Sequence, residues 1–236
     1  MPSFLIAPKL LELFATEVPF DINLDAYDGV ISTHHYSSSL IATHKEKQKC
    51  NVPLIDVHTD YTPFPIIIHP FIDCYTGAVP NEDADKNLNP KLVATGIPVR
   101  KAFRYDGRPK EPTIIILGGA DGFGELEKIA LFAKQLDPSY TIQVICGRNN
   151  DARVRLGEII SSSDVFGYIE DISPYLNRAE FIITKASGLS VTEALNCESI
   201  PLFPPPILSW EDEAARYISA RGAGVCIPDF NDAGVR

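Results

Sequence analysis

A glycine-rich segment in the second half of the sequence has residues whose types and spacing could bind a phosphate group. Segment 118–124 reads Gly-Gly-Ala-Asp-Gly-Phe-Gly and directly follows an apolar, β-branched run. Glycines in such a turn allow backbone N–H groups to approach a phosphate and direct the next helix N-terminus toward it. The segment has neither the G-x-G-x-x-G pattern of dinucleotide-binding folds nor the Gly-Lys-Ser of a P-loop. A phosphate site and a plain tight turn are therefore both open interpretations.

Segment 184–195 combines a strand end, a turn of small residues and the start of a helix. The preceding residues 181–183 are Phe-Ile-Ile, which is typical of a buried strand. Ser190 and Glu193 have the S-x-x-E spacing of a capping box. A strand, a turn and a helix N-terminus in this order form a backbone cradle for an anionic or hydroxyl-rich ligand. The alternative is an ordinary capped helix, because capping boxes are common.

Two more segments carry charged residues after predicted strands. Arg148 stands in the polar turn 146–150, where its guanidinium could donate to a diphosphate, and a solvated loop arginine is the alternative. In segment 204–213, Ser209 and Asp212 are predicted to cap a helix, and acidic residues in its first turn suit the helix dipole. That structural explanation accounts for these charges without any ligand.

The first half offers titratable residues at and beyond strand ends. Asp60 closes a predicted strand, His69 follows it, and His34 and His35 follow an earlier strand. A carboxylate that faces a cleft could deprotonate a hydroxyl group. Histidines and aspartates in loops are, however, more often surface or capping residues. No spacing typical of a Ser/His/Asp triad or of a metal-ligand set is visible.

The elements that position these residues alternate between strands and helices. Such alternation predicts an α/β fold with parallel sheets covered on both faces. Segment 100–112, rich in Lys, Arg, Gly and Pro, is the predicted linker. It divides the chain into an N-terminal domain at 1–105 and a C-terminal domain at 106–236. The predicted strands are 28–33, 52–57, 72–76, 92–99, 113–117, 140–146, 165–168, 181–184 and 200–202, and the predicted helices are 37–46, 125–136, 151–161, 172–178, 190–195 and 210–221.

The composition excludes several classes of protein. A net charge of −10 argues against a nucleic-acid partner, because binding to a phosphate backbone needs clustered Lys and Arg. The five cysteines are widely spaced and include no C-x-x-C, which indicates neither a zinc site nor a disulfide framework and favours the reducing cytoplasm. No apolar run is long enough to span a bilayer. Residues 1–14 are predicted to form an amphipathic helix.

An ordered set of short strings, between about residues 29 and 228, resembles a known family. The chain is similar to GT-B glycosyltransferases of family 28. Its nearest branch is that of the monogalactosyldiacylglycerol synthases and the processive diacylglycerol glucosyltransferases. No single string is decisive, but all occur in the family's order. The strings are 59–61 (Thr-Asp-Tyr), 95–99, 118–127, 146–149, 167–171, 184–195 and 222–225.

The resemblance implies two Rossmann-like domains, with the acceptor in the first and a UDP-sugar in the second. It implies inverting, metal-independent transfer of a hexose to a diacylglycerol-type lipid, without a cofactor, at the surface of a membrane. A helix dipole would stabilise the departing UDP. The implied location is cytoplasmic, with peripheral membrane association, and the implied process is glycolipid biosynthesis. The implied donor-site residues are Gly118, Gly119, Gly122, Gly124 and Arg148 at the diphosphate, Ser187 and Gly188 at the helix start, Glu193 at the ribose, and Trp210 and Glu211 beside the sugar.

Several positions depart from the family pattern. No Gly-Gly-His-type loop, which often supplies the base, precedes Asp28, so the N-terminal domain is expected to be incomplete and the chain a truncated or divergent member. Phe64 stands where a histidine is usual, which leaves Asp60 and His69 as the catalytic candidates. Trp210 replaces the amide that usually reads the sugar. Two alternatives stay open: a nucleotide-sugar-binding homologue without turnover, and a UDP-sugar 2-epimerase. The sequence also leaves open the sugar, the lipid, the oligomeric state and the activity of this chain alone.

Overall fold

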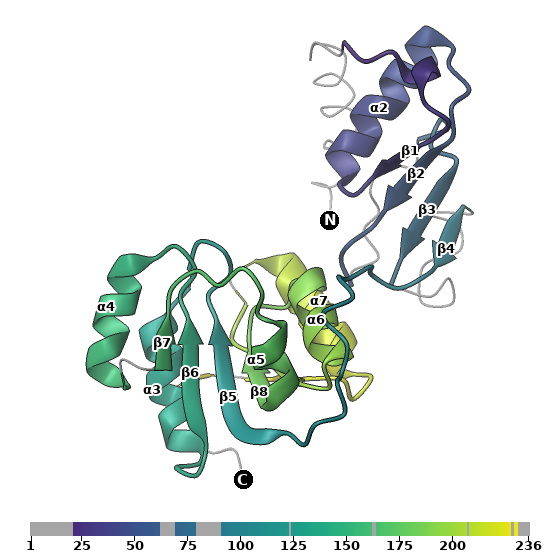
Figure 1. Ribbon diagram of the computed structural model, residues 1–236. Coiled ribbons are helices and arrows are strands. Elements are labelled where there is room, and N and C mark those ends of the chain that lie inside the picture. The colour runs from purple at the N-terminus through teal and green to yellow at the C-terminus, as the bar shows by residue number, and fades with distance from the viewer. Residues whose placement is uncertain are drawn as a thin grey trace. The chain divides into compact units, whose positions relative to one another are not determined.

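The computed structural model describes residues 21–61, 69–78, 91–122, 124–161, 164–206, 208–227 and 229–230. The chain divides into two compact units, Met1–Pro98 and Val99–Arg236. The described part of each unit contains one parallel β-sheet, of four strands in the first and six in the second (Figure 1). The predicted α/β fold with two parallel sheets is thus confirmed. The helix predicted at 1–14, the position of Phe64, segment 80–90 and Phe123 of the glycine-rich segment lie outside the described residues.

The first unit is built from four short parallel strands and one long helix. Polar residues between β1 and the helix end the strand, and the side chain of His34 accepts a hydrogen bond from the N–H of Tyr36 at the N-cap. The helix α2 then returns to the amino end of β2, where Lys45 Nζ bonds to Asp73 Oδ2 at 2.5 Å. The elements are η2 (Leu24–Ala26), β1 (Val30–Ser32), α2 (His35–Gln48), β2 (Leu54–Val57), β3 (Cys74–Gly77) and β4 (Leu92–Ala94), with the strands in the order β1-β2-β3-β4.

The second unit contains the predicted alternation of strands and helices. Its sheet order is β10-β9-β8-β5-β6-β7, and every pair of neighbours is parallel. The last strand, β10, was not predicted. The elements are β5 (Glu111–Leu117), α3 (Leu126–Leu136), β6 (Thr141–Ile145), α4 (Asn150–Ile159), β7 (Val165–Phe166), α5 (Ser173–Arg178), β8 (Ala179–Ile183), α6 (Gly188–Asn196), β9 (Ile200–Phe203), α7 (Ser209–Ser219) and β10 (Val225–Cys226).

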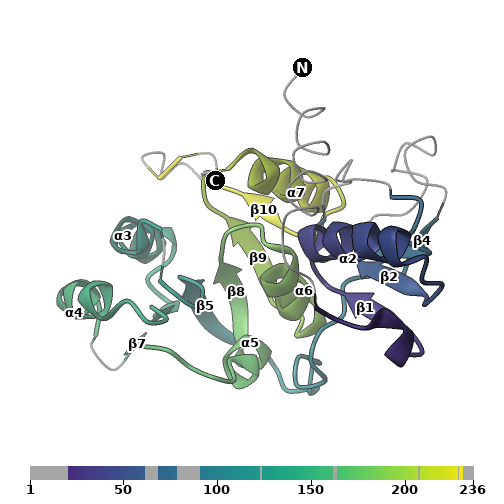
Figure 2. The same cartoon turned by 90° about the horizontal axis from the view of Figure 1, so that it is seen from above.

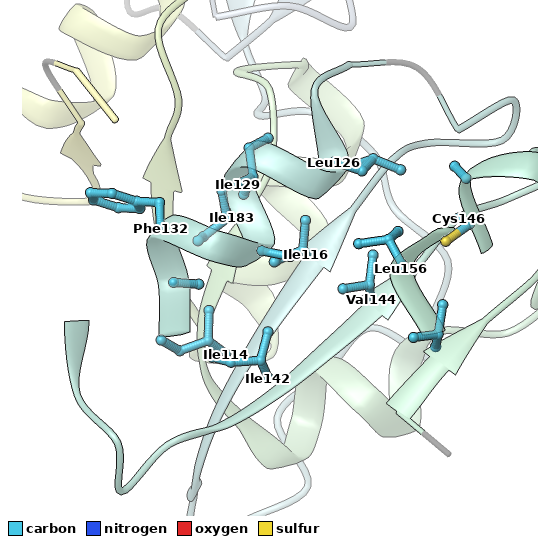
Figure 3. Close-up of a cluster of buried hydrophobic side chains, with 14 of the residues drawn as sticks. Ile114, Ile116, Leu126, Ile129, Phe132, Ile142, Val144, Cys146, Leu156 and Ile183 are labelled. Atoms are coloured by element: carbon cyan, nitrogen blue, oxygen red, sulfur yellow. The ribbon is translucent and has the colours of Figure 1, made fainter. Parts of the chain in front are cut away.

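Both faces of the central strand β5 are covered, which explains its apolar run 114–117. Ile114 and Ile116 point to the face covered by α3 and α4, where they pack with Leu126 and Val144 (Figure 3). Ile115 points to the opposite face and packs with Leu176 of α5 and Ala194 of α6. Figure 2 shows the two pairs of helices on the two sides of the sheet.

The predicted linker at 100–112 is wrong, because this segment packs on the second unit. Phe103 is only 2% exposed and lies in the cluster of Ile115. The N–H of Tyr105 donates to the carbonyl of Asn196 at 2.8 Å, and Glu111 already begins β5. Most charged side chains of the segment are exposed, which gives it the composition of a loop. Phe103 nevertheless anchors it, and Lys110 Nζ donates to the carbonyl of Leu176 at 2.9 Å. The division between the units accordingly precedes the expected boundary at 105/106.

Candidate functional site

The order of the six-stranded sheet reverses between β5 and β8. From β5 the chain proceeds through β6 and β7 to one edge, and from β8 through β9 and β10 to the other. Ligands of open α/β sheets bind at such a switch point, at the carboxyl ends of the strands. Because β5 and β8 are hydrogen-bonded neighbours, the two segments singled out from the sequence, 118–124 and 184–195, leave the sheet side by side at this point.

The glycines of segment 118–124 have two different roles. A Cβ atom on Gly122 would lie 2.1 Å from the Cys146 carbonyl oxygen, and one on Gly118 would lie 2.9 Å from Gly122 Cα. These two glycines are therefore needed for packing inside the protein. Gly119 and Gly124 have φ angles of 72° and 109°, and a Cβ on either would meet nothing within 4 Å. Of the four glycines predicted to contact the diphosphate, only Gly119 and Gly124 have open space beside them.

The loop after β6 locks the loop after β5. Gly147 takes a φ of 57°, and a Cβ on it would lie 2.3 Å from the carbonyl oxygen of Gly119. The N–H of Arg148 donates to the carbonyl of Ala120 at 2.9 Å, and the side-chain amide of Asn149 donates to the carbonyl of Gly122 at 3.0 Å. Asn149 also accepts a hydrogen bond from the N–H at the start of α4. Asn149 and Gly147 were not predicted as site residues, although the string 146–149 contains them.

The side chain of Arg148 is held at the surface by two neighbours. Its Nη1 lies 3.3 Å from Asp121 Oδ1, and its guanidinium carbon lies 5.0 Å from the centre of the Tyr168 ring. Exposed ion pairs of this kind contribute about 0–1 kcal/mol, so an anion could compete for the guanidinium. The predicted contact of Arg148 with a diphosphate would require it to leave Asp121.

The helix α6 begins earlier than the sequence predicted. Its N-cap is Ser187, which makes no side-chain capping bond, and the Ser187 carbonyl accepts the N–H of Val191 at 3.1 Å. The predicted capping box is therefore wrong, because Ser190 and Glu193 lie within the first two turns. Nothing after Ser187 prevents the helix from starting at Gly188. Its first backbone N–H groups carry no capping side chain and can bind an anion.

Glu193 faces two charged residues that sequence reasoning did not assign to the site. Burial raises the pKa of Glu193, the positive charge of Arg100 lowers it, and the negative charge of Asp171 raises it. Arg100 directly follows the string 95–99 and lies over the ring of Phe103, 4.8 Å from the ring centre. Asp171 accepts the N–H of Ser173 at 3.0 Å. Glu193 is half-buried, and because α6 begins at Gly188 it does not have the capping role that the sequence predicted.

Glu211 and Trp210, at the start of α7, differ in how far they are exposed to solvent. Glu211 is only 7% exposed and forms an ion pair of 3.5 Å with Lys185, which follows β8. Trp210 is 48% exposed. The predicted cap is wrong here as well, because the helix begins at Ser209 with Leu208 as N-cap and no side-chain bond, and Asp212 instead accepts from Arg216 at 3.0 Å. The ion pair with Lys185 was not predicted.

In the first unit, the structure does not bring Asp60 and His69 together. Asp60 follows the carboxyl end of β2. His69 is 4% exposed and precedes β3 at the opposite, amino edge of the sheet, where its Nε2 lies 4.0 Å from Glu46 near the end of α2. The His69 ring accepts the backbone N–H of Phe71, and the backbone N–H of His69 donates to the Tyr75 hydroxyl at 2.9 Å. His69 therefore packs inside the unit, and only Asp60 lies at the edge where ligands of α/β sheets bind.

Comparison with curated proteins shows similarity to one kind of enzyme. The chain is 27% identical, over 211 residues, to a processive diacylglycerol β-glucosyltransferase of Bacillus cereus strain B4264. The match covers 80% of this chain and 53% of the relative. No protein-family model matches the chain.

Comparison with solved structures shows similarity of fold. MurG of Acinetobacter baumannii superposes with a TM-score of 0.61 at 18% identity, covering 97% of this chain and 66% of MurG. The chain is related to the GT-B glycosyltransferases. The predicted resemblance to GT-B proteins is thereby confirmed.

The GT-B fold alone does not determine the reaction of this chain. A proposed UDP-N-acetylglucosamine 2-epimerase of Listeria monocytogenes superposes with a TM-score of 0.56 at 15% identity, covering 98% of this chain and 68% of that protein. The GT-B chain described here also spans only about half the length of the curated relatives it matches. None of the helices in the described ranges is long and apolar enough to cross a lipid bilayer.

Proposed function

We propose that this protein transfers a hexose from a UDP-sugar to a hydroxyl group of a diacylglycerol-type lipid. The attacking oxygen would form a bond to C1 of the sugar as the bond from C1 to the β-phosphate breaks, with inversion at C1 and without a metal ion. The observation that carries this proposal is the switch point between β5 and β8, where two open glycines and an uncapped helix N-terminus leave neighbouring strands. The similarity to a diacylglycerol glucosyltransferase supports the choice of reaction and acceptor.

The donor would bind to the second unit. Gly119 and Gly124 leave room for a diphosphate at the β5 loop, and the N-terminus of α6, at Ser187 and Gly188, favours its negative charge. The same dipole would stabilise UDP as it departs. Glu193 would accept hydrogen bonds from the ribose hydroxyls, because its carboxylate does not accept a capping N–H at the start of the helix.

The sugar would lie beside the start of α7. The ion pair with Lys185 holds the buried carboxylate of Glu211 in place, while Trp210 stays exposed. A fixed carboxylate can accept from sugar hydroxyls, and an exposed indole can cover the ring. The acceptor lipid, at a membrane surface, would be bound by the first unit.

The function is tested by binding and transfer in parallel. Calorimetry with UDP is expected to give a dissociation constant below 1 mM, and labelled UDP-glucose with diacylglycerol micelles is expected to give a glycolipid. A protein that binds no UDP at millimolar concentration would contradict the donor site. Binding without transfer would indicate a nucleotide-sugar-binding homologue, and conversion of UDP-GlcNAc to a 2-epimer would indicate an epimerase.

From the presence of Trp210 beside the proposed sugar site, we predict weak discrimination between donor sugars. An indole has one N–H donor and cannot hold two adjacent hydroxyls as an amide can. The affinities for UDP-glucose, UDP-galactose and UDP-GlcNAc, measured by calorimetry, should therefore differ by less than tenfold, about 1.4 kcal/mol. Trp210→Gln should widen this spread by restoring the amide. A parent protein with a larger preference would show that other residues read the sugar.

A further inference from the structure

Lys185 stands at the switch point of the second sheet, and the proposed function gives its ammonium group no contact with the donor. It follows β8 and precedes Ser187, the N-cap of α6, by two residues. The N–H of Ser187 donates to the carbonyl of Lys185 at 2.7 Å, which ties the backbone of Lys185 to the helix start. Segments 118–124 and 184–188, which leave β5 and β8, contain one basic residue between them, and this residue is Lys185.

The side chain of Lys185 extends toward the start of α7. Its Nζ lies 3.5 Å from Oε1 of Glu211, and the side chains of Lys185 and Glu211 are 63% and 8% exposed. A buried carboxylate is costly unless a cation pairs with it. Among the residues that the structure describes, Lys185 is the basic residue that pairs with Glu211. Because β8 and β9 are hydrogen-bonded neighbours, the loops that follow them hold the two charges together.

The ammonium group of Lys185 has donors left for an anion. An ammonium group carries three N–H donors, and the contact with one carboxylate oxygen of Glu211 engages one of them. Lysine binds phosphate as a compact point charge and does not need the paired geometry of a guanidinium group. Arg148 must leave Asp121 to reach a diphosphate, whereas Lys185 can donate to one without leaving Glu211.

We propose that Lys185 binds the diphosphate of the donor while it stays paired with Glu211, an inference that rests on the proposed transferase function. Its ammonium group adds a full positive charge to the partial charge of the α6 N-terminus. One side chain thereby connects the diphosphate with the carboxylate that lies beside the sugar. The nucleotide and sugar parts of the donor site are then held in register by a single charge.

The test compares Glu211→Gln with the double variant Lys185→Gln/Glu211→Gln. Lys185→Gln alone would leave a buried carboxylate unpaired and could unfold the protein, whereas both compared variants carry a neutral amide at position 211. Calorimetry should show that the double variant binds UDP at least about tenfold more weakly than Glu211→Gln. Both variants should bind uridine, which has no phosphate, with affinities within twofold of each other. Equal affinities for UDP, or an equal loss for UDP and uridine, would overturn the proposal.

Two more variants, made in the Glu211→Gln background, separate the position of the charge from the net charge. Lys185→Arg keeps the cation and should bind UDP within about threefold of Glu211→Gln. Lys134→Gln removes an exposed cation from the last turn of α3, which lies at the amino edge of the sheet, and should also stay within threefold. A loss in Lys134→Gln as large as that in Lys185→Gln would overturn the proposal.

The same measurements distinguish a failure of this inference from a failure of the proposed function. Absent UDP binding by the parent protein at millimolar concentration would overturn the donor site itself. UDP binding by the parent, with equal UDP affinities of Glu211→Gln and the double variant, would overturn only the role of Lys185.

Discussion

Gly147→Ala is expected to destabilise the second unit by about 2–5 kcal/mol. The new Cβ would lie 2.3 Å from the Gly119 carbonyl oxygen and 2.4 Å from that of Ala120, and the backbone at Gly147 has a φ of 57°. The left-handed backbone costs about 1–2 kcal/mol in a residue with a side chain, and overpacking costs about 1–3 kcal/mol more. Such a loss is a large part of the 5–15 kcal/mol that stabilises an ordinary domain.

Gly119→Ala is the matched control, because its φ of 72° is similar but a Cβ there meets nothing within 4 Å. It should lose only the backbone contribution, about 1–2 kcal/mol. Urea unfolding of the parent and both variants measures the difference. Equal losses in the two variants would show that the loops after β5 and β6 are not locked together as the structure describes.

Glu193→Gln is expected to lower UDP affinity by about tenfold or more. A carboxylate that accepts two ribose hydroxyls makes charge-assisted hydrogen bonds of about 1.5–3 kcal/mol each, and an amide replaces only part of this. Calorimetry with UDP measures the effect. Glu213→Gln is the matched control, because it removes the same charge from an exposed position of α7 and should leave UDP affinity unchanged.

Glu193→Gln should not destabilise the protein at neutral pH. Burial raises the pKa of Glu193 in the folded state, so the folded protein binds more protons than the unfolded chain just above the ordinary pKa of glutamate. Folding stability contributed by this group therefore falls as pH rises through that window. Glu193→Gln removes this dependence and should leave the urea midpoint equal or higher at pH 7. An unchanged UDP affinity of Glu193→Gln would contradict the proposed contact between Glu193 and the ribose.

The strands and helices could be predicted because their signals are local. The run 114–117 is apolar throughout, and the helix 126–136 repeats apolar residues at helical spacing, so both elements were expected close to their observed limits. The predictions of the helix caps were wrong because they, too, relied on a local signal. A serine followed three residues later by an acid marks a helix start, but the chain can begin its helix earlier, as it does at Gly188 and Ser209.

The site could be predicted only in part, because its geometry depends on contacts between segments far apart in the sequence. Glycines 118, 119, 122 and 124 look alike in a sequence, and only the folded loop and its contact with the loop after β6 decide which of them lack space for a Cβ. The pairing of Lys185 with Glu211 depends on two adjacent strands. His69 follows Asp60 closely in the chain, yet the return of the chain to the amino edge of the sheet separates them.

The locked loop after β5 also has a thermodynamic consequence for a ligand. Its conformation is set by Gly147, Asn149 and the backbone of Arg148, all of which belong to the protein. A flexible phosphate-binding loop loses conformational entropy when it closes on its ligand, and this loss weakens affinity. Here the ordering occurs during folding, so a diphosphate that enters the site would spend little of its binding free energy on organising the loop.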